Sequence, residues 1–309
     1  MKSPLFGADI ISIADLSQSD ILTILKLAAH FKKHPNADNL KQKIIATCFF
    51  EPSTRTRLSF ETAVHRLAGS VIGFDDAQQT SSGQKGESLR DAMRVIGSYA
   101  DAIVIRHPNA GAARLASEVT NTPVINAGDG GNQHPSQTLL DLFSIQESQG
   151  KLKGLNIALV GDLKYGRTVH SLAQALTLFD ARLFFVSPEA LAMPDSICEY
   201  LRSRGIRYSF HKDLHDIIDK VDVLYMTRLQ KERFIASEFE QIKHSFILTP
   251  ELVAQGQKHM KVMHPLPRVQ EIHQAVDQMP QAYYFEQAAN GVPTRQAMLT
   301  LLLQKEIKV

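Results

Sequence analysis

Short apolar runs alternate with amphipathic segments along most of the chain. The runs at 44–50, 70–74 and 102–105 have the length and composition of buried strands, and the segments after them place apolar residues at the 3.6-residue spacing of helices. Regular alternation of strand and helix is typical of a parallel sheet that helices cover on both faces. The pattern therefore predicts an α/β protein.

The same alternation starts again beyond two glycines, Gly150 and Gly154. Because 309 residues suit two domains of ordinary size, we expect two doubly wound domains, over residues 1–150 and 151–286, each with a mainly parallel sheet covered by helices on both faces. A last helix, from about 287 to 303, is apolar over much of its circumference, which indicates burial. We expect this C-terminal helix to cross back, so that residues 287–309 complete the first domain.

Composition and charge exclude some classes of protein. The chain has 34 basic and 32 acidic residues, a net charge of +2, so no basic excess exists to pair with a polyanion and we expect no nucleic acid partner. No apolar run of signal-peptide or membrane-span length follows Met1, which predicts a cytoplasmic protein with no membrane partner. Cys48 and Cys198 lack ligand spacing and form no disulfide framework, so we expect two buried thiols.

The most informative stretch follows the first predicted strand. Pro52 and Ser53 signal the start of a helix whose first turn carries Thr54, Arg55 and Thr56. Free backbone N–H groups, the positive end of the helix dipole, hydroxyls and a guanidinium together can hold a phosphate or a carboxylate. An ordinary Ser or Thr cap with surface arginines is the alternative interpretation.

A histidine stands at a second predicted helix start. His134 lies between a glycine-rich turn and Pro135, a favoured first helical residue. The helix dipole keeps such an imidazole neutral, so it can donate a hydrogen bond to a polarised carbonyl. A histidine that only caps the turn is the alternative.

Earlier in the chain, the polar segment 75–87 is too long for a routine connection, which is typical of a functional or a disordered loop.

Two arginines follow predicted strands in the second half of the chain. The turn 161–168 is close to a P-loop, but Arg167 stands near the position of the required lysine and the turn lacks G-x-G-x-x-G, so a carboxylate clamp is favoured over nucleotide binding. Arg228 and Gln230 lie just beyond another strand, where open α/β sheets bind ligands. A solvated charge run is the alternative for that segment.

Prolines define one more segment, Pro265-Leu266-Pro267-Arg268. We expect an extended turn here, because Pro265 and Pro267 both oppose a helix. Its main-chain carbonyls are then available to an amide.

Five segments together resemble the aspartate/ornithine transcarbamoylase family, and the resemblance runs essentially from end to end. They are Ser53-Thr54-Arg55-Thr56-Arg57, the loop 81–87, Arg106-His107-Pro108, His134-Pro135-Ser136-Gln137 and His264-Pro265-Leu266-Pro267-Arg268. Within the family, Lys85 and Pro265 favour aspartate over ornithine as the acceptor. Ornithine or another amine is the alternative substrate, and a non-catalytic scaffold chain is the alternative class.

The resemblance implies a role for each matching residue toward carbamoyl phosphate. The implied phosphate ligands are Ser53, Thr54, Arg55, Thr56 and Arg106. Thr56, Arg106 and His134 would polarise the carbonyl. Gln137 and the main-chain carbonyls of Pro265 and Leu266 would bind the amide group. The implied catalytic residues are Arg55, Thr56, Lys85, Arg106 and His134.

The resemblance also implies how aspartate is held and how chains assemble. The residues implied to bind aspartate are Lys85, Arg167, Arg228 and Gln230. Ser81 and Lys85 would reach the site of a neighbouring subunit, which implies a homotrimer, and a regulatory chain could join such trimers. Glu51 and Arg233 match residues that bridge the domains on closure.

The implied reaction is carbamoyl transfer in de novo pyrimidine biosynthesis. The amine of L-aspartate attacks the carbamoyl carbon, a tetrahedral intermediate forms and phosphate leaves, with no metal or cofactor. No side chain of these segments is an obvious base, so a phosphate oxygen of the leaving group is the expected proton acceptor. Catalysis would rest on positioning and electrostatics.

Overall fold

The computed structural model describes residues 2–76, 80, 84–228 and 246–307. The chain divides into two compact units. Unit 1 comprises Met1–Phe143 and Ala289–Val309, and unit 2 comprises Ser144–Ala288. The chain leaves unit 1 within helix α6 (Pro135–Gln149) and returns to it at the end of α11 (Tyr284–Ala289).

Unit 1 contains a four-stranded parallel sheet with the order β2-β1-β3-β4. Its strands are β1 (Ile44–Phe49), β2 (Ser70–Phe74), β3 (Ala102–His107) and β4 (Val124–Asp129). The strand order reverses between β1 and β3, and the carboxyl ends of these strands are in register, because Phe49 pairs with Arg106. A main-chain hydrogen bond of 2.8 Å from Phe50 to the Arg106 carbonyl continues that pairing. Ligands of open α/β sheets bind at such a reversal.

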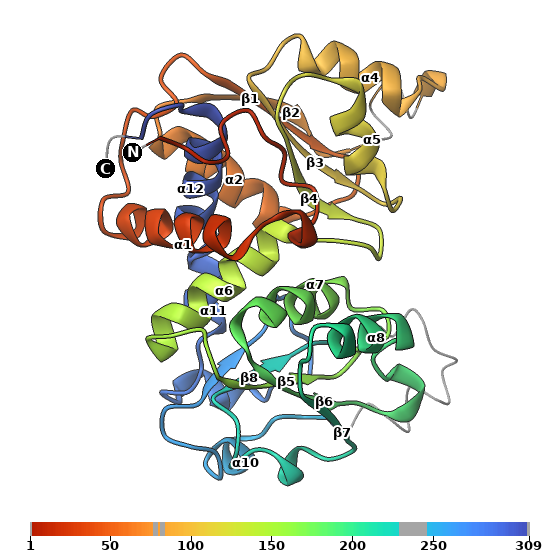
Figure 1. Ribbon diagram of the computed structural model, residues 1–309, viewed down its shortest axis with the longest axis vertical. Helices are drawn as coiled ribbons and strands as arrows, with labels where there is room; N and C mark the ends of the chain where they lie inside the picture. Colours follow the sequence, from red (N-terminus) through yellow and green to blue (C-terminus); the bar gives the residue numbers. More distant parts are fainter. Residues whose placement is uncertain (1, 77–79, 81–83, 229–245, 308–309) are drawn as a thin grey trace. The chain divides into compact units, whose positions relative to one another are not determined.

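Helices cover both faces of this sheet (Figure 1). They are α1 (Gln18–Lys33), α2 (Thr54–Arg66), α4 (Leu89–Gly97), α5 (Ala112–Val119) and α12 (Gly291–Leu303). Helix α1 begins with a capping box in which Ser17 and Asp20 exchange hydrogen bonds. Helix α12 is buried over most of its length and packs on α1 and α2, as its apolar circumference predicted.

The sequence predicted one continuous helix where the structure has two. Helix α11 ends at Ala289 and α12 begins at Gly291. Pro293 explains the interruption, since it has no N–H group to donate to residue 289. With the new start, Pro293 falls in the first turn of α12, where the missing donor is tolerated.

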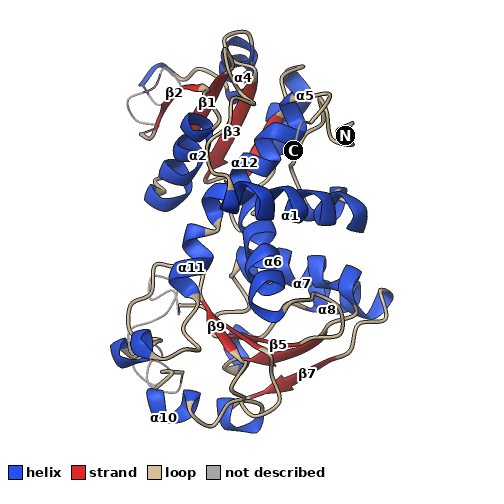
Figure 2. Ribbon diagram, turned by 90° about the vertical axis from the view of Figure 1, so that its left-hand side faces the viewer, coloured by secondary structure: helices blue, strands red, loops and turns tan. Residues whose placement is uncertain are grey.

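Unit 2 contains a five-stranded parallel sheet with the order β7-β6-β5-β8-β9. The strands are β5 (Asn156–Val160), β6 (Arg182–Val186), β7 (Tyr208–His211), β8 (Val223–Met226) and β9 (Lys261–Met263). Helices α7 (Arg167–Leu176) and α8 (Asp195–Ser203) cover one face, and α10 (Pro250–Val253) lies on the other (Figure 2). The order of this sheet reverses between β5 and β8.

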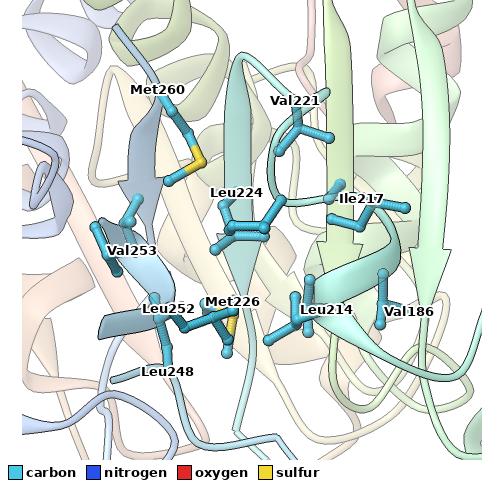
Figure 3. Close-up of a cluster of buried hydrophobic side chains, with 14 of the residues drawn as sticks. Val186, Leu214, Ile217, Val221, Leu224, Met226, Leu248, Leu252, Val253 and Met260 are labelled. Carbon is cyan, nitrogen blue, oxygen red and sulfur yellow. The ribbon is translucent and has the colours of Figure 1, made fainter. Parts of the chain in front are cut away.

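The core beneath this second sheet is made of aliphatic side chains from strands and connecting segments. Figure 3 shows part of it, with labels on Val186, Leu214, Ile217, Val221, Leu224, Met226, Leu248, Leu252, Val253 and Met260. Such a core fixes the ends of β5 and β8, from which the predicted ligand residues project. The predicted fold class, two doubly wound α/β units with α12 in the first, is confirmed.

Two further expectations concern single features. Cys48 and Cys198 are both free and buried, as expected. Among the helices of the described residues, none combines the length and the apolar character needed to cross a membrane.

Candidate active site

The start of helix α2 presents unused backbone donors. The first intrahelical bond runs from the Arg57 N–H to the Ser53 carbonyl, at 3.1 Å. The N–H groups of Thr54, Arg55 and Thr56 precede that bond and have no acceptor within the helix. Ser53 occupies the N-cap position, but its side chain makes no capping hydrogen bond. The geometry therefore favours the predicted anion cradle over an ordinary cap.

Two arginines of this helix have different surroundings. Arg57 forms an ion pair with Glu61 (2.7 Å) and another with Asp75. Arg55 has no carboxylate partner within the described ranges, and partial burial together with the charge of Arg106 lowers its pKa. Two neighbouring guanidinium groups that repel each other are stabilised by a shared anion. Among the described residues, Arg57 is thus committed to carboxylates while Arg55 is not, which favours Arg55 as the cation of the predicted cradle.

Arg106 is the penultimate residue of strand β3, and its side chain is largely buried. Its guanidinium donates to Glu51 (3.0 Å) and to the Ala127 carbonyl (3.3 Å). Its Nε is buried and has no hydrogen-bond partner among the residues that the structure describes. Burial lowers the pKa of Arg106, and Glu51 opposes that shift. A buried donor without an acceptor is rare in proteins, so Arg106 is suited to bind an oxyanion.

His134 lies where the sequence placed it, directly before helix α6, and its side chain is buried. The turn that leads to it is organised by Asp129, whose carboxylate accepts hydrogen bonds from Asn126 (2.9 Å), the Gln133 N–H (3.1 Å) and the Gly111 N–H (2.8 Å). Sequence reasoning missed Asp129. The signal was an acidic residue next to a Gly-Gly turn, a common organiser of loops.

Gln137 is oriented by a carboxylate one helical turn away. Its Nε2 donates to Asp141 at 2.9 Å. Because a carboxylate only accepts, this bond defines which end of the Gln137 amide is the nitrogen and leaves its oxygen as an acceptor. The charge of Asp141 in turn faces Arg295 of α12, which is fully buried with its guanidinium over the ring of Phe60 (4.8 Å). Sequence reasoning missed Asp141 and Arg295.

In unit 2, Arg167 and Arg228 follow the two strands at which the sheet order reverses. Arg167 is the first residue of α7, after β5, and Arg228 stands two residues beyond β8. Thr227 joins the two connections, because its hydroxyl donates to the Val160 carbonyl (2.8 Å) and accepts from the Asp162 N–H (3.1 Å). The structure thus places both predicted carboxylate clamps at the switch point of this sheet.

The remaining predicted residues are less fully placed. Ser81, Gln230 and Arg233 lie outside the described residues. Lys85 is exposed on unit 1. Glu51, predicted to take part in domain closure, pairs with Arg106 within unit 1.

The proline turn differs from its prediction in one respect. Leu266 has a φ of +53°, in the left-handed region, although the residue before a proline is normally extended. The expected extended turn is therefore wrong at Leu266. Arg268, which ends the turn, pairs with Asp277 and donates to the Tyr284 hydroxyl (3.0 Å), so it supports the turn from one side.

The fold and these groups define a class of protein. Each doubly wound unit gathers arginines at the carboxyl ends of its strands, and unit 1 adds a helix amino end and a buried histidine. Such a chain binds small anionic substrates.

The comparison with known proteins narrows this class to a family. A family model for the carbamoyl-P binding domain of aspartate/ornithine carbamoyltransferase matches residues 8–147, and one for the Asp/Orn binding domain matches residues 153–302. The chain belongs to the aspartate/ornithine carbamoyltransferase family.

Individual relatives match over nearly the whole length. The chain is 58% identical over 309 residues to the aspartate carbamoyltransferase catalytic subunit of Vibrio cholerae serotype O1, covering 99% of this chain and 100% of that protein. Among solved structures, the catalytic subunit of M. jannaschii aspartate transcarbamoylase is similar with a TM-score of 0.89 and 51% identity, covering 94% of this chain and 96% of that one. Aspartate transcarbamoylase from Trypanosoma cruzi in complex with N-(phosphonacetyl)-L-aspartic acid is similar with a TM-score of 0.92 and 38% identity, covering 97% of each chain.

Proposed function

We propose that the chain transfers the carbamoyl group of carbamoyl phosphate to the amine of L-aspartate, giving N-carbamoyl-L-aspartate and phosphate, in pyrimidine biosynthesis. The observation that carries the proposal is a pair of neighbouring guanidinium groups beside the start of α2. Among the described residues, Arg55 has no carboxylate partner and the buried Nε of Arg106 has no acceptor. The relatives of this chain support the proposal, since the similar aspartate transcarbamoylase from Trypanosoma cruzi is described in complex with carbamoyl phosphate and aspartate.

Unit 1 would hold the phosphate and the carbonyl of carbamoyl phosphate. The proposed phosphate ligands are the free N–H groups of α2 and the side chains of Ser53, Thr54, Arg55, Thr56 and Arg106. Thr56, Arg106 and His134 are proposed to stabilise the negative charge that develops on the carbonyl oxygen. Burial of Thr56 and His134 strengthens their interactions, because solvent screens them less.

The carbamoyl amide group needs acceptors, since it donates two N–H bonds. Gln137 supplies one, because Asp141 already takes its nitrogen and leaves its oxygen. The main-chain carbonyls of Pro265 and Leu266 are proposed as the others. Three acceptors of this kind reject a substrate with a methyl group in place of the amide, because the acceptors would then stay unpaired.

For aspartate we propose Arg167, Arg228 and Gln230 as carboxylate ligands. Planar guanidinium groups bind a carboxylate through two parallel hydrogen bonds, which fixes the orientation of the amine. Ser81 and Lys85 are proposed to act in the site of a neighbouring chain.

The reaction would proceed by attack of the aspartate amine on the carbamoyl carbon. The tetrahedral intermediate collapses when its C–O bond to phosphate breaks, and an oxygen of the departing phosphate takes the proton of the amine. The side chains named above hold the reacting groups in place and stabilise charge. Closure of the two domains through Glu51 and Arg233 stays a prediction.

A homotrimer is part of the proposal. Exposed large apolar side chains of unit 1 include Ile44 on β1, Ile72 on β2, Val95 on α4 and Tyr99 just after α4. A subunit interface that covered them would remove apolar surface from water. The relatives are named catalytic subunits, which supports a regulatory partner. A cytoplasmic location stays a prediction from the sequence.

The test is phosphate release from carbamoyl phosphate by the purified chain, with aspartate and ornithine compared as acceptors. We expect phosphate release and N-carbamoyl-L-aspartate with aspartate alone, and none from a His134→Ala control. Release with ornithine only would overturn the choice of acceptor. Absence of release with either amine would overturn the proposed function.

A further inference from the structure

The turn after strand β9 contains a residue in an unfavourable backbone conformation. Leu266 has a φ of +53°. A left-handed conformation is unfavourable for a residue other than glycine, and it persists only where the surrounding structure holds it. Such residues concentrate at binding and catalytic sites. The contacts that hold Leu266 in this conformation therefore indicate the function of the turn.

The side chain of His264 holds Leu266 in this conformation. The Leu266 N–H donates to His264 Nδ1 at 2.8 Å. Since Nδ1 accepts a hydrogen bond, the imidazole proton is on Nε2, and Nε2 donates to Glu271 Oε1 at 2.8 Å. Glu271 thus fixes the tautomer that allows His264 to hold the backbone.

Glu271 and His264 are themselves fixed and buried. Glu271 Oε2 accepts hydrogen bonds from the main-chain N–H groups of Val269 (3.1 Å) and Gln270 (3.0 Å). The main-chain N–H of His264 donates to the side-chain oxygen of Gln287 in α11 (2.8 Å). The side chains of His264 and Glu271 are 1% and 8% exposed. Burial raises the pKa of Glu271, but the hydrogen bonds from His264 and from main-chain N–H groups outweigh it, so its pKa lies below the ordinary value.

The direction of the Leu266 N–H determines the direction of the carbonyl before it. In a trans peptide the N–H and C=O groups point to opposite sides. With the Leu266 N–H directed at His264, the Pro265 carbonyl points away from the buried pair. Within the described part of the chain, neither this carbonyl nor that of Leu266 accepts a hydrogen bond.

We propose that His264 and Glu271 are positioning residues for the carbamoyl amide. Through the Leu266 N–H, the pair fixes the direction of the Pro265 carbonyl and the conformation of Leu266, the two residues whose carbonyls are the proposed acceptors for the amide. This inference rests on the proposed function and extends it to two residues that do not touch the substrate.

Substitutions of His264 separate positioning from a merely structural role. In His264→Asn, the side-chain oxygen takes the place of Nδ1 and still accepts from Leu266, but the bond to Glu271 is lost. In His264→Gln, the amide reaches Glu271, but the acceptor for Leu266 is lost. We expect KM for carbamoyl phosphate to rise about tenfold or more in His264→Gln and less than about threefold in His264→Asn, since one or two neutral hydrogen bonds are at stake.

Inorganic phosphate provides the matched probe, because it lacks the amide. We expect its affinity, measured by calorimetry, to equal that of wild type in both variants. Equal KM values for the two variants, or a parallel loss of phosphate affinity, would overturn the inference. If the His264 variants fail to fold, Glu271→Gln is used, and an unchanged KM with a lowered melting temperature refutes positioning. Wild-type turnover is recorded in the same assay. If the wild type turns over, an unexpected result for the variants refutes only the positioning role; if it does not, the proposed function itself fails.

Discussion

Arg55 and Arg57 provide a controlled experiment within one helix turn. The residues are two positions apart and chemically identical, yet Arg57 is paired with Glu61 and Asp75 while Arg55 lies beside Arg106. We expect Arg55→Ala to lower kcat about 10²- to 10³-fold, the usual effect of removing one donor to a developing negative charge. Its melting temperature should change little or rise, because the repulsion from Arg106 is relieved.

Arg57→Ala should show the opposite pattern. Its ion pairs are partly exposed to solvent, so their loss removes about 0.5–1 kcal/mol of stability and lowers the melting temperature by about 1–4 °C. Its kcat should stay within about threefold of wild type, which corresponds to a change of less than ~0.7 kcal/mol in the activation free energy. The assays are steady-state phosphate release and thermal unfolding of both variants. Comparable loss of kcat in the two variants would refute the assignment of Arg55 alone to the cradle.

Two other predictions concern assembly and pH. Mixing inactive Lys85→Ala and His134→Ala chains should restore about a quarter of wild-type activity, since one site in four then receives both native residues. A mixture as inactive as its parents would exclude shared sites. Asp277→Asn should lower the melting temperature most at about pH 7 and progressively less toward about pH 3. Hydrogen bonds from Arg268 hold the pKa of Asp277 below 3.8. The stabilisation that the Asp277 carboxylate provides is therefore lost as pH falls through that lowered pKa. A difference that is the same at every pH would contradict this reasoning.

Local features were predictable from the sequence. The strand Ser70–Phe74 occurs with the predicted bounds, because apolar composition and turn residues determine such elements locally. The helix start after Ser53 was also predictable, since it needs only a strand end and the start signals of one turn. The position of His134 directly before a helix was predictable for the same reason.

Features that depend on distant residues could not be predicted. Arg295 faces Asp141 across the fold, and no pattern near either residue indicates it. Leu266 departs from the usual conformation before proline, because its N–H bonds to the His264 imidazole and the buried Glu271 holds that imidazole in place, which no sequence pattern indicates. The break at Asn290 was missed, since apolar periodicity continues through it.

The position of α12 has a consequence for the order in which the protein folds. The helix packs on α1 and α2, yet it follows all of unit 2 in sequence. A ribosome therefore completes unit 2 before unit 1 can cover its apolar helix faces. Near the two ends of the chain the Ser3 N–H bonds to the Lys305 carbonyl at 3.0 Å. In topological terms unit 2 is an insertion into unit 1, and the helix that completes unit 1 is synthesised last.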